Sequence, residues 1–95
     1  MKIELCQIIQ PNNDIIPLVP RRATLSLKEI YAALDTDTFE IATEHSTQWY
    51  LLVDENAKML NKPVNPIATA IFRANTKLTD LICGTAILCH PSLLN

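Results

Sequence analysis

Two short segments of this chain are apolar on both faces, and they constrain the fold more than any other feature of the sequence. Residues 47–54 (TQWYLLVD) place apolar side chains on both sides of an extended strand. Residues 81–89 (LICGTAILC) form a continuous apolar run of strand length, which holds Gly84, the only glycine in the chain. A strand of this kind lies in the middle of a sheet or under an interface with another molecule. We therefore expect both segments in a sheet interior or at a contact surface.

The clearest local signal predicts a short helix over residues 27–34. Ser26 and Glu29 have the spacing of a capping box, in which each side chain accepts a hydrogen bond from the other residue's backbone N–H. Leu25 and Ile30 have the spacing of a hydrophobic staple across the same helix start. Helical periodicity then predicts one apolar face, made of Leu27, Ile30, Tyr31 and Leu34.

A second helix is expected to begin at Asn65-Pro66. Asparagine is a favoured N-cap, and proline at the first helical position loses nothing, because its missing N–H would have no partner there. Residues at helical spacing predict an apolar face made of Ile67, Ala70, Ile71 and Ala74. Asn65 is thus interpreted first as a helix cap.

The remaining segments complete an α+β pattern. Alternation and turn residues predict strands over residues 2–9 and 38–44. A short edge strand is expected over residues 15–20, where two prolines limit pairing. The order predicts a single α+β domain over residues 1–95, with a small antiparallel or mixed sheet and two short helices. Without the edge strand the order is βαββαβ, which fits a ferredoxin-like domain.

Charge and cysteine content argue against several classes of protein. The net charge is −2, and apart from the adjacent Arg21 and Arg22 the basic residues are scattered, which argues against nucleic-acid binding. No apolar run reaches the ~20 residues of a membrane-spanning helix. Three cysteines without an export signal favour the cytoplasm, where thiols stay reduced. The Arg21-Arg22 pair is either solvated or in contact with an acidic partner.

No motif in the sequence predicts a catalytic residue, a metal site or a cofactor. The chain has no glycine-rich phosphate loop, and its cysteines lie in no CxxC motif or His/Cys cluster. The neighbouring carboxylates Asp54 and Glu55 could form an acid–base pair. Adjacent residues on a tight turn usually point apart, however, so a turn is the favoured interpretation, and an enzyme is the less favoured one.

One ligand site is compatible with the pattern. Asn65 and Thr69 lie at the start of the second helix, whose free N–H groups and positive dipole end attract anions. Together with the Asp54-Glu55 turn they could surround a pocket for a small ligand or a nucleotide. This ligand-binding function, with or without catalysis, is the alternative to a purely structural role for these residues.

The C-terminal half follows a recognisable pattern: an apolar strand runs into an acidic turn and a lysine, a capped helix follows, and a strand with Ile-x-Gly closes it. The residues that carry this pattern are Asp54, Glu55, Lys58, Asn65, Ala68, Thr69, Ile82 and Gly84. In these residues the chain resembles DUF3846, a family of small bacterial and phage domains of unknown function. The resemblance implies an α+β fold and a phage or mobile-element ancestry. It implies no activity and no cofactor.

The apolar composition favours a protein that associates with a partner. Apolar residues make up 48% of the chain and charged residues 19%, a low charged share for a fully solvated monomer. We predict an association surface on the two apolar strands, made of Trp49, Tyr50, Leu52 and Gly84. The sequence therefore predicts a small cytoplasmic binding or accessory module that acts through protein–protein interaction, as a homodimer and with an unknown protein partner.

Overall fold

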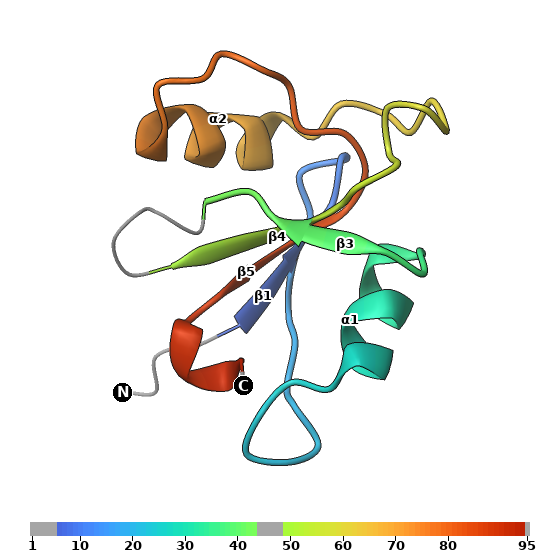
Figure 1. The fold of residues 1–95 in the computed structure, drawn as a ribbon, viewed down its shortest axis with the longest axis vertical. Coiled ribbons are helices and arrows are strands. Elements are labelled where there is room, and N and C mark those ends of the chain that lie inside the picture. The colour runs from blue at the N-terminus through green and yellow to red at the C-terminus, as the bar shows by residue number, and fades with distance from the viewer. Residues whose placement is uncertain (1–5, 44–48, 95) are drawn as a thin grey trace.

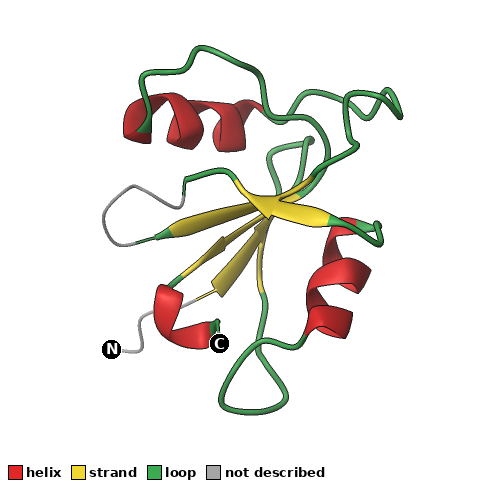
Figure 2. Cartoon of the chain, in the orientation of Figure 1, coloured by secondary structure: helices red, strands yellow, loops and turns green. Residues whose placement is uncertain are grey.

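The computed structural model describes residues 6–43 and 49–94. It shows one antiparallel sheet with a helix on each face (Figure 1, Figure 2). The strands are β1 (Cys6–Ile9), β2 (Ile15–Pro17), β3 (Phe39–Ile41), β4 (Tyr50–Asp54) and β5 (Ala86–Cys89). The helices are α1 (Leu27–Leu34) and α2 (Pro66–Asn75), and a single 3-10 turn, η1 (Pro91–Leu93), follows β5. The predicted strand residues 2–5, 44 and 47–48 lie outside the described ranges.

The sheet has five strands in the order β2-β1-β5-β4-β3, and every neighbouring pair is antiparallel. This arrangement confirms the α+β class and the edge position of β2. It is not a clear ferredoxin-like fold, because the last strand, β5, lies between β1 and β4. The two helices also lie on opposite faces of the sheet (Figure 1).

The two-faced apolar strands are explained by a core on each side of the sheet. On one face, Leu52 and Ile87 pack with the buried residues of α1. On the other face, Leu51 and Ala86 pack with the buried residues of α2. All four side chains are 0% exposed. The prediction that these strands lie in a sheet interior is therefore confirmed, and both faces are covered by helices of the same chain.

Helix α1 begins as its sequence predicts. The Ser26 hydroxyl accepts a hydrogen bond from Glu29 N (3.1 Å), and the Glu29 carboxylate accepts one from Ser26 N (2.9 Å), so the capping box is complete. Ile30 and Leu34 are buried against the sheet. Leu27, expected on the apolar face, is 59% exposed instead. It occupies the first helical position.

Helix α2 also begins where expected, but the prediction of its apolar face was wrong. The buried residues are Ala68, Thr69 and Phe72, whereas Ala70 and Ala74 are exposed. The helix is apolar on most sides, so periodicity alone fits more than one face. The hydrogen bonds of Thr69 decide between them: its hydroxyl accepts from Ile82 N (3.0 Å), which turns this side of α2 toward the chain before β5.

Strand β5 is shorter than the apolar run that predicts it. Gly84 has φ of +78°, a left-handed conformation that favours glycine, and it separates β5 from the isolated bridge at Cys83. The Gly84 N–H donates to Pro63 O (2.7 Å), so another stretch of backbone approaches closely at this point. A Cβ atom there would lie 3.1 Å from Lys62 Cδ. The lone glycine thus permits both a turn and a close approach.

Asn65 joins three distant segments through one buried side chain. Its Oδ1 accepts from Ala68 N (3.1 Å), which confirms the helix cap. Its Nδ2 donates to Ile9 O (2.8 Å) at the end of β1 and to Gly84 O (2.9 Å) before β5. The side chain is 0% exposed. The role of Asn65 is therefore larger than that of a helix cap.

Asn65→Ala is expected to lower the free energy of unfolding by about 2–4 kcal/mol, because it removes the cap and leaves two buried carbonyl groups without this donor. Urea unfolding at neutral pH measures the change. Asn75→Ala is the matched control, since Asn75 lies on the same helix but is exposed, and its side chain donates to Ile71 O within that helix. That control should change stability by less than about 0.5 kcal/mol. Equal losses in the two variants would contradict the structural role assigned to Asn65.

Candidate functional site

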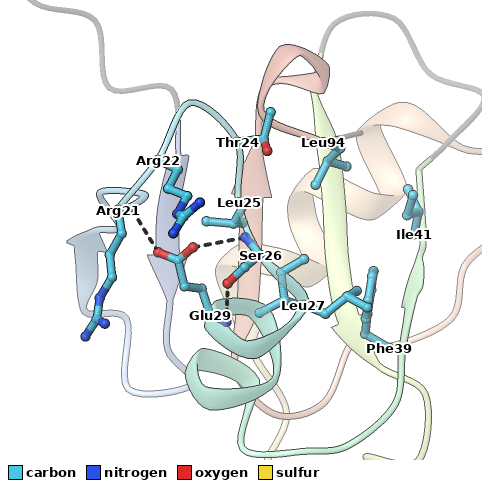
Figure 3. A pocket seen from close by; sticks show the side chains of 11 residues that line it. Arg21, Arg22, Thr24, Leu25, Ser26, Leu27, Glu29, Phe39, Ile41 and Leu94 are labelled. Carbon is cyan, nitrogen blue, oxygen red and sulfur yellow. Dashed lines mark hydrogen bonds between the residues drawn. The ribbon is translucent and has the colours of Figure 1, made fainter.

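A groove of about 590 Å³ opens beside the N-terminal end of α1 (Figure 3). Three parts of the chain surround it: the loop and first turns of α1, strand β3, and the segment after η1. Its lining residues are Arg21, Arg22, Thr24, Leu25, Ser26, Leu27, Glu29, Ile30, Phe39, Ile41 and Leu94. A cavity of this size with mostly apolar walls and a few convergent polar groups is typical of binding sites.

The walls of the groove are apolar because the core on the α1 side is not fully closed there. Leu25 and Ile30 are buried at the base, while Phe39 and Ile41 of β3 are half-buried and pack against the same core. Leu27 adds a mostly exposed apolar side chain at the helix start. The groove is therefore a place where apolar surface faces solvent.

Charged groups lie along one side of this groove. The Glu29 carboxylate accepts hydrogen bonds from Ser26 N (2.9 Å) and Arg21 N (3.1 Å). The bond from Ser26 is the main reason that the pKa of Glu29 lies below its usual value. The guanidinium groups of Arg21 and Arg22 are exposed and form no ion pair or hydrogen bond with any residue that the structure describes. In Figure 3 the Arg22 side chain extends toward Glu29, and the Arg21 guanidinium points away from the other lining side chains.

Asp54, a predicted ligand residue, is buried at the end of β4, and both of its carboxylate oxygens have partners. Its Oδ1 accepts from Thr36 Oγ1 (3.0 Å) and Asn56 N (2.9 Å). Its Oδ2 lies 2.8 Å from Lys62 Nζ. Burial raises the pKa of Asp54, but the bonds from Lys62, Asn56 and Thr36 outweigh it, so the pKa is lower than usual. The carboxylate is ionised at neutral pH and holds its surroundings in place.

Lys62 extends the same network to α1. Its ammonium group donates to Asp35 O (2.8 Å) and Leu34 O (3.4 Å), at the C-terminal end of the helix. A cation at this position satisfies free carbonyl groups and complements the helix dipole. Lys58, the lysine that the acidic-turn pattern singles out, instead pairs with Asp80 on the surface.

The four predicted ligand residues do not share one pocket. Asp54 and Glu55 line a second cavity of about 340 Å³, between β3, β4 and α2. Asn65 and Thr69 do not line that cavity, and their side chains bond to the backbone of neighbouring segments. Glu55 is exposed. Whether any of the four binds a ligand stays a prediction.

The four predicted interface residues contact their own chain. Leu52 is fully buried in the core on the α1 side, and Gly84 is buried beside Lys62. Tyr50 is half-buried against the same core as Leu52. The Trp49 ring packs edge-on against that of His90, with 5.5 Å between ring centres. The association surface predicted from these residues stays a prediction.

Sequence reasoning missed the groove, because its walls come from segments that are far apart in the chain. One signal pointed toward it: Arg21-Arg22, for which an acidic partner was one of the two interpretations. A second signal is Leu27, which the helical pattern assigns to the apolar face but which the structure leaves exposed at the groove.

Within residues 6–43 and 49–94, no group of three or more His, Cys, Asp or Glu side chains is placed to hold a metal ion. No helix in that part of the chain is long and apolar enough to cross a membrane.

Residues 8–92 match the family model described as "Domain of unknown function (DUF3846)", so the chain belongs to this family. The match covers nearly the whole chain and extends well beyond the C-terminal half, where the motif residues lie. No curated protein and no solved structure matches the chain.

Lys62→Met is expected to lower the free energy of unfolding by about 2–3 kcal/mol at pH 7, because it leaves a buried, ionised Asp54 without its cation. The folded-state pKa of Asp54 is lowered in the wild type, so the pair stabilises the fold above about pH 4 and the contribution is lost as the pH falls further. In the variant, burial without the lysine raises that pKa. The deficit of the variant should therefore shrink on acidification, as measured by urea unfolding at pH 7, 5 and 3.

Lys58→Met is the matched control for this variant. The Lys58–Asp80 pair is exposed on both sides, with side-chain exposures of 53% and 65%, so its loss should cost less than about 0.5 kcal/mol. A deficit in Lys62→Met that does not change with pH would contradict the assignment of the ion pair.

Proposed function

We propose that this member of the DUF3846 family is a small binding module that acts through protein–protein contact, with the groove beside α1 as its binding surface. One observation supports this most directly: Leu27 has the spacing of the apolar side of α1, yet it is 59% exposed at a groove whose walls are mostly apolar. Transferring such a side chain from water into a contact is favourable by roughly 1.5–3 kcal/mol. A partner that covers the groove would gain this energy.

We also propose a cytoplasmic location for this module, where cysteine thiols stay reduced. Cys6 and Cys89 lie opposite each other on β1 and β5, and both are free and buried. The hydrogen bond between them and their burial raise the pKa of Cys6 far above its usual range. Cys6 is therefore a protonated thiol in the core.

Peptide display tests the binding function and requires no identified partner. A library of random peptides is selected on the wild-type protein, and the enriched peptides are measured against Leu27→Glu and Met59→Glu by fluorescence polarisation. Binding to Leu27→Glu should weaken at least about 10-fold, as expected for a lost apolar contact. Met59 is 74% exposed and does not line the groove, so Met59→Glu should bind as the wild type does. Enriched peptides that bind all three proteins equally would refute the groove as the binding surface.

We also propose that the protein forms a homodimer through β2, the sheet edge on the side opposite β3. Ile15 and Ile16 of this strand are 48% and 43% exposed, and they are neighbours, so the strand offers apolar surface on both of its faces. Exposed apolar side chains that lie together in this way mark a surface for association with a second chain.

Native mass spectrometry over a concentration series tests the homodimer. The wild type should show a species of twice the 10.6 kDa chain mass, and Ile16→Glu should raise its dissociation constant at least about 10-fold. Met59→Glu is again the control, because it places the same charge on an exposed residue outside β2. A wild type that stays monomeric at all concentrations would rule out the dimer and leave the groove proposal untouched.

The alternative function is the binding of a small ligand in the second cavity, which Asp54 and Glu55 line together with Phe72 of α2. Native mass spectrometry tests this alternative: an added mass that disappears in Glu55→Gln would favour ligand binding in the second cavity. Because Glu55 is exposed, we expect this substitution to leave the fold intact.

A further inference from the structure

Strand β3 presents an open edge of the sheet. It stands last in the strand order. Ala42 N donates to Leu51 O of β4, and in an antiparallel pair every second residue bonds to the same neighbour. The N–H and C=O groups of Glu40, two residues before Ala42, therefore also face β4. By the alternation of an antiparallel pair, the N–H and C=O groups of Phe39 and Ile41 face away from β4. No segment that the structure describes hydrogen-bonds to them. These backbone groups are available to another strand.

The two edges of the sheet differ in how well they accept a new strand. Sheets commonly protect their edges with proline, charge or covering segments. Strand β2 ends in Pro17, which has no N–H to donate. Strand β3 contains no proline, and its one charged residue, Glu40, does not line the groove. The β3 edge is therefore the better template.

The groove is continuous with this edge. The side chains of Phe39 and Ile41 both face the α1 side and line the groove. In an added strand, every second side chain would lie on that same side, next to Phe39 and Ile41. Apolar side chains at those positions would also approach Leu27 and Leu94 (Figure 3). Backbone pairing and apolar burial would thus occur together.

The charges around the groove select the chemistry of such a strand. Arg21 and Arg22 are among the lining residues, and within the described ranges their guanidinium groups form no ion pair or hydrogen bond. Only the Arg22 side chain extends along the groove, toward Glu29, whereas the Arg21 guanidinium points away from the other lining side chains (Figure 3). The oxygens of Glu29, the acidic residue beside them, already accept from backbone N–H groups. A guanidinium group binds a carboxylate through two parallel hydrogen bonds. On the other side of the sheet, β3 exposes Glu40, which would repel acidic side chains.

We propose that β3 binds an extended peptide segment of a partner protein as an additional strand. The side chains of the segment that face α1 are apolar, with one carboxylate among them that pairs with Arg22, and the side chains that face away are neutral. This inference rests on the proposed binding function of the groove, and it names the class of partner: an extended, apolar segment with an acidic side chain on its apolar side.

The test uses a capped seven-residue peptide, Thr-Leu-Thr-Val-Thr-Glu-Thr, whose leucine, valine and glutamate share one side of an extended strand. Its dissociation constant is measured by isothermal titration calorimetry on the full chain. Replacing the glutamate by glutamine should weaken binding about 5–10-fold, as expected for a charge-assisted pair. The same replacement should have no effect on the variant in which both Arg21→Ala and Arg22→Ala are present.

Backbone pairing is tested separately by N-methylation of the peptide. In an added strand, every second peptide N–H faces β3 and the others face solvent. Methylation of the N–H groups that face β3 blocks pairing, whereas methylation of those that face solvent leaves pairing intact. One methylated peptide should therefore lose binding and the other should keep it. In the wild type, NMR should show slowed hydrogen exchange at the Phe39 and Ile41 amides when the peptide is bound.

Each other outcome overturns the proposal. Equal loss, or no loss, in the two methylated peptides excludes strand addition, and binding that is insensitive to glutamine excludes the acidic requirement. Protection of Phe39 and Ile41 that rises with protein concentration alone would assign the edge to a second copy of the chain. Equal binding of decanoate, which has no backbone amide, would assign the groove to an alkyl carboxylate. In all of these cases the proposed function stands if displayed peptides still require Leu27, and it fails only if they do not.

Discussion

The buried carboxamide of Asn65 is the contact on which the rest of the structure depends. It is the point where the start of α2, the end of β1 and the turn before β5 meet. Because carbonyl groups in the core need donors, the three segments cannot separate from one another without leaving polar groups unpaired. This one side chain therefore fixes where α2 crosses the sheet and where β5 enters it. Thr69 continues the same contact one helical turn later.

Local features of the fold could be predicted from the sequence, and long-range ones could not. The capping box of Ser26 and Glu29 is local, since both partners lie within one turn, and it is formed as predicted. The cap at Asn65 is local as well, but its bond to Ile9 spans 56 residues and that to Gly84 spans 19. The periodicity of apolar residues in a sequence does not indicate such long-range hydrogen-bond partners. The apolar face of α2 was misassigned for a related reason, because tertiary hydrogen bonds orient a helix that is apolar on most sides.

The candidate site shows the same limit. Apolar segments were expected to form an association surface, yet much of their area covers a core on each side of the sheet, as Leu52 shows with no exposed surface. The groove lies beside the N-terminal end of α1. Its lining residues are up to 73 positions apart in the sequence, as Arg21 and Leu94 are. Residue types alone suggested only its charged side, at Arg21 and Arg22. The position of β3 as an edge follows from the strand order and from no local pattern.

The central position of β5 has a consequence for how the chain folds. The strands before it form two hairpin-like pairs, β1 with β2 and β3 with β4, and neither pair contacts the other within the sheet. Only β5, the last strand along the sequence, bonds to both β1 and β4. Pairings between β1 and β5 join residues that are far apart in the chain, which makes their closure slow compared with hairpin formation. We expect the two halves to remain separate until β5 inserts between them, so that assembly of the sheet is a single late and cooperative step.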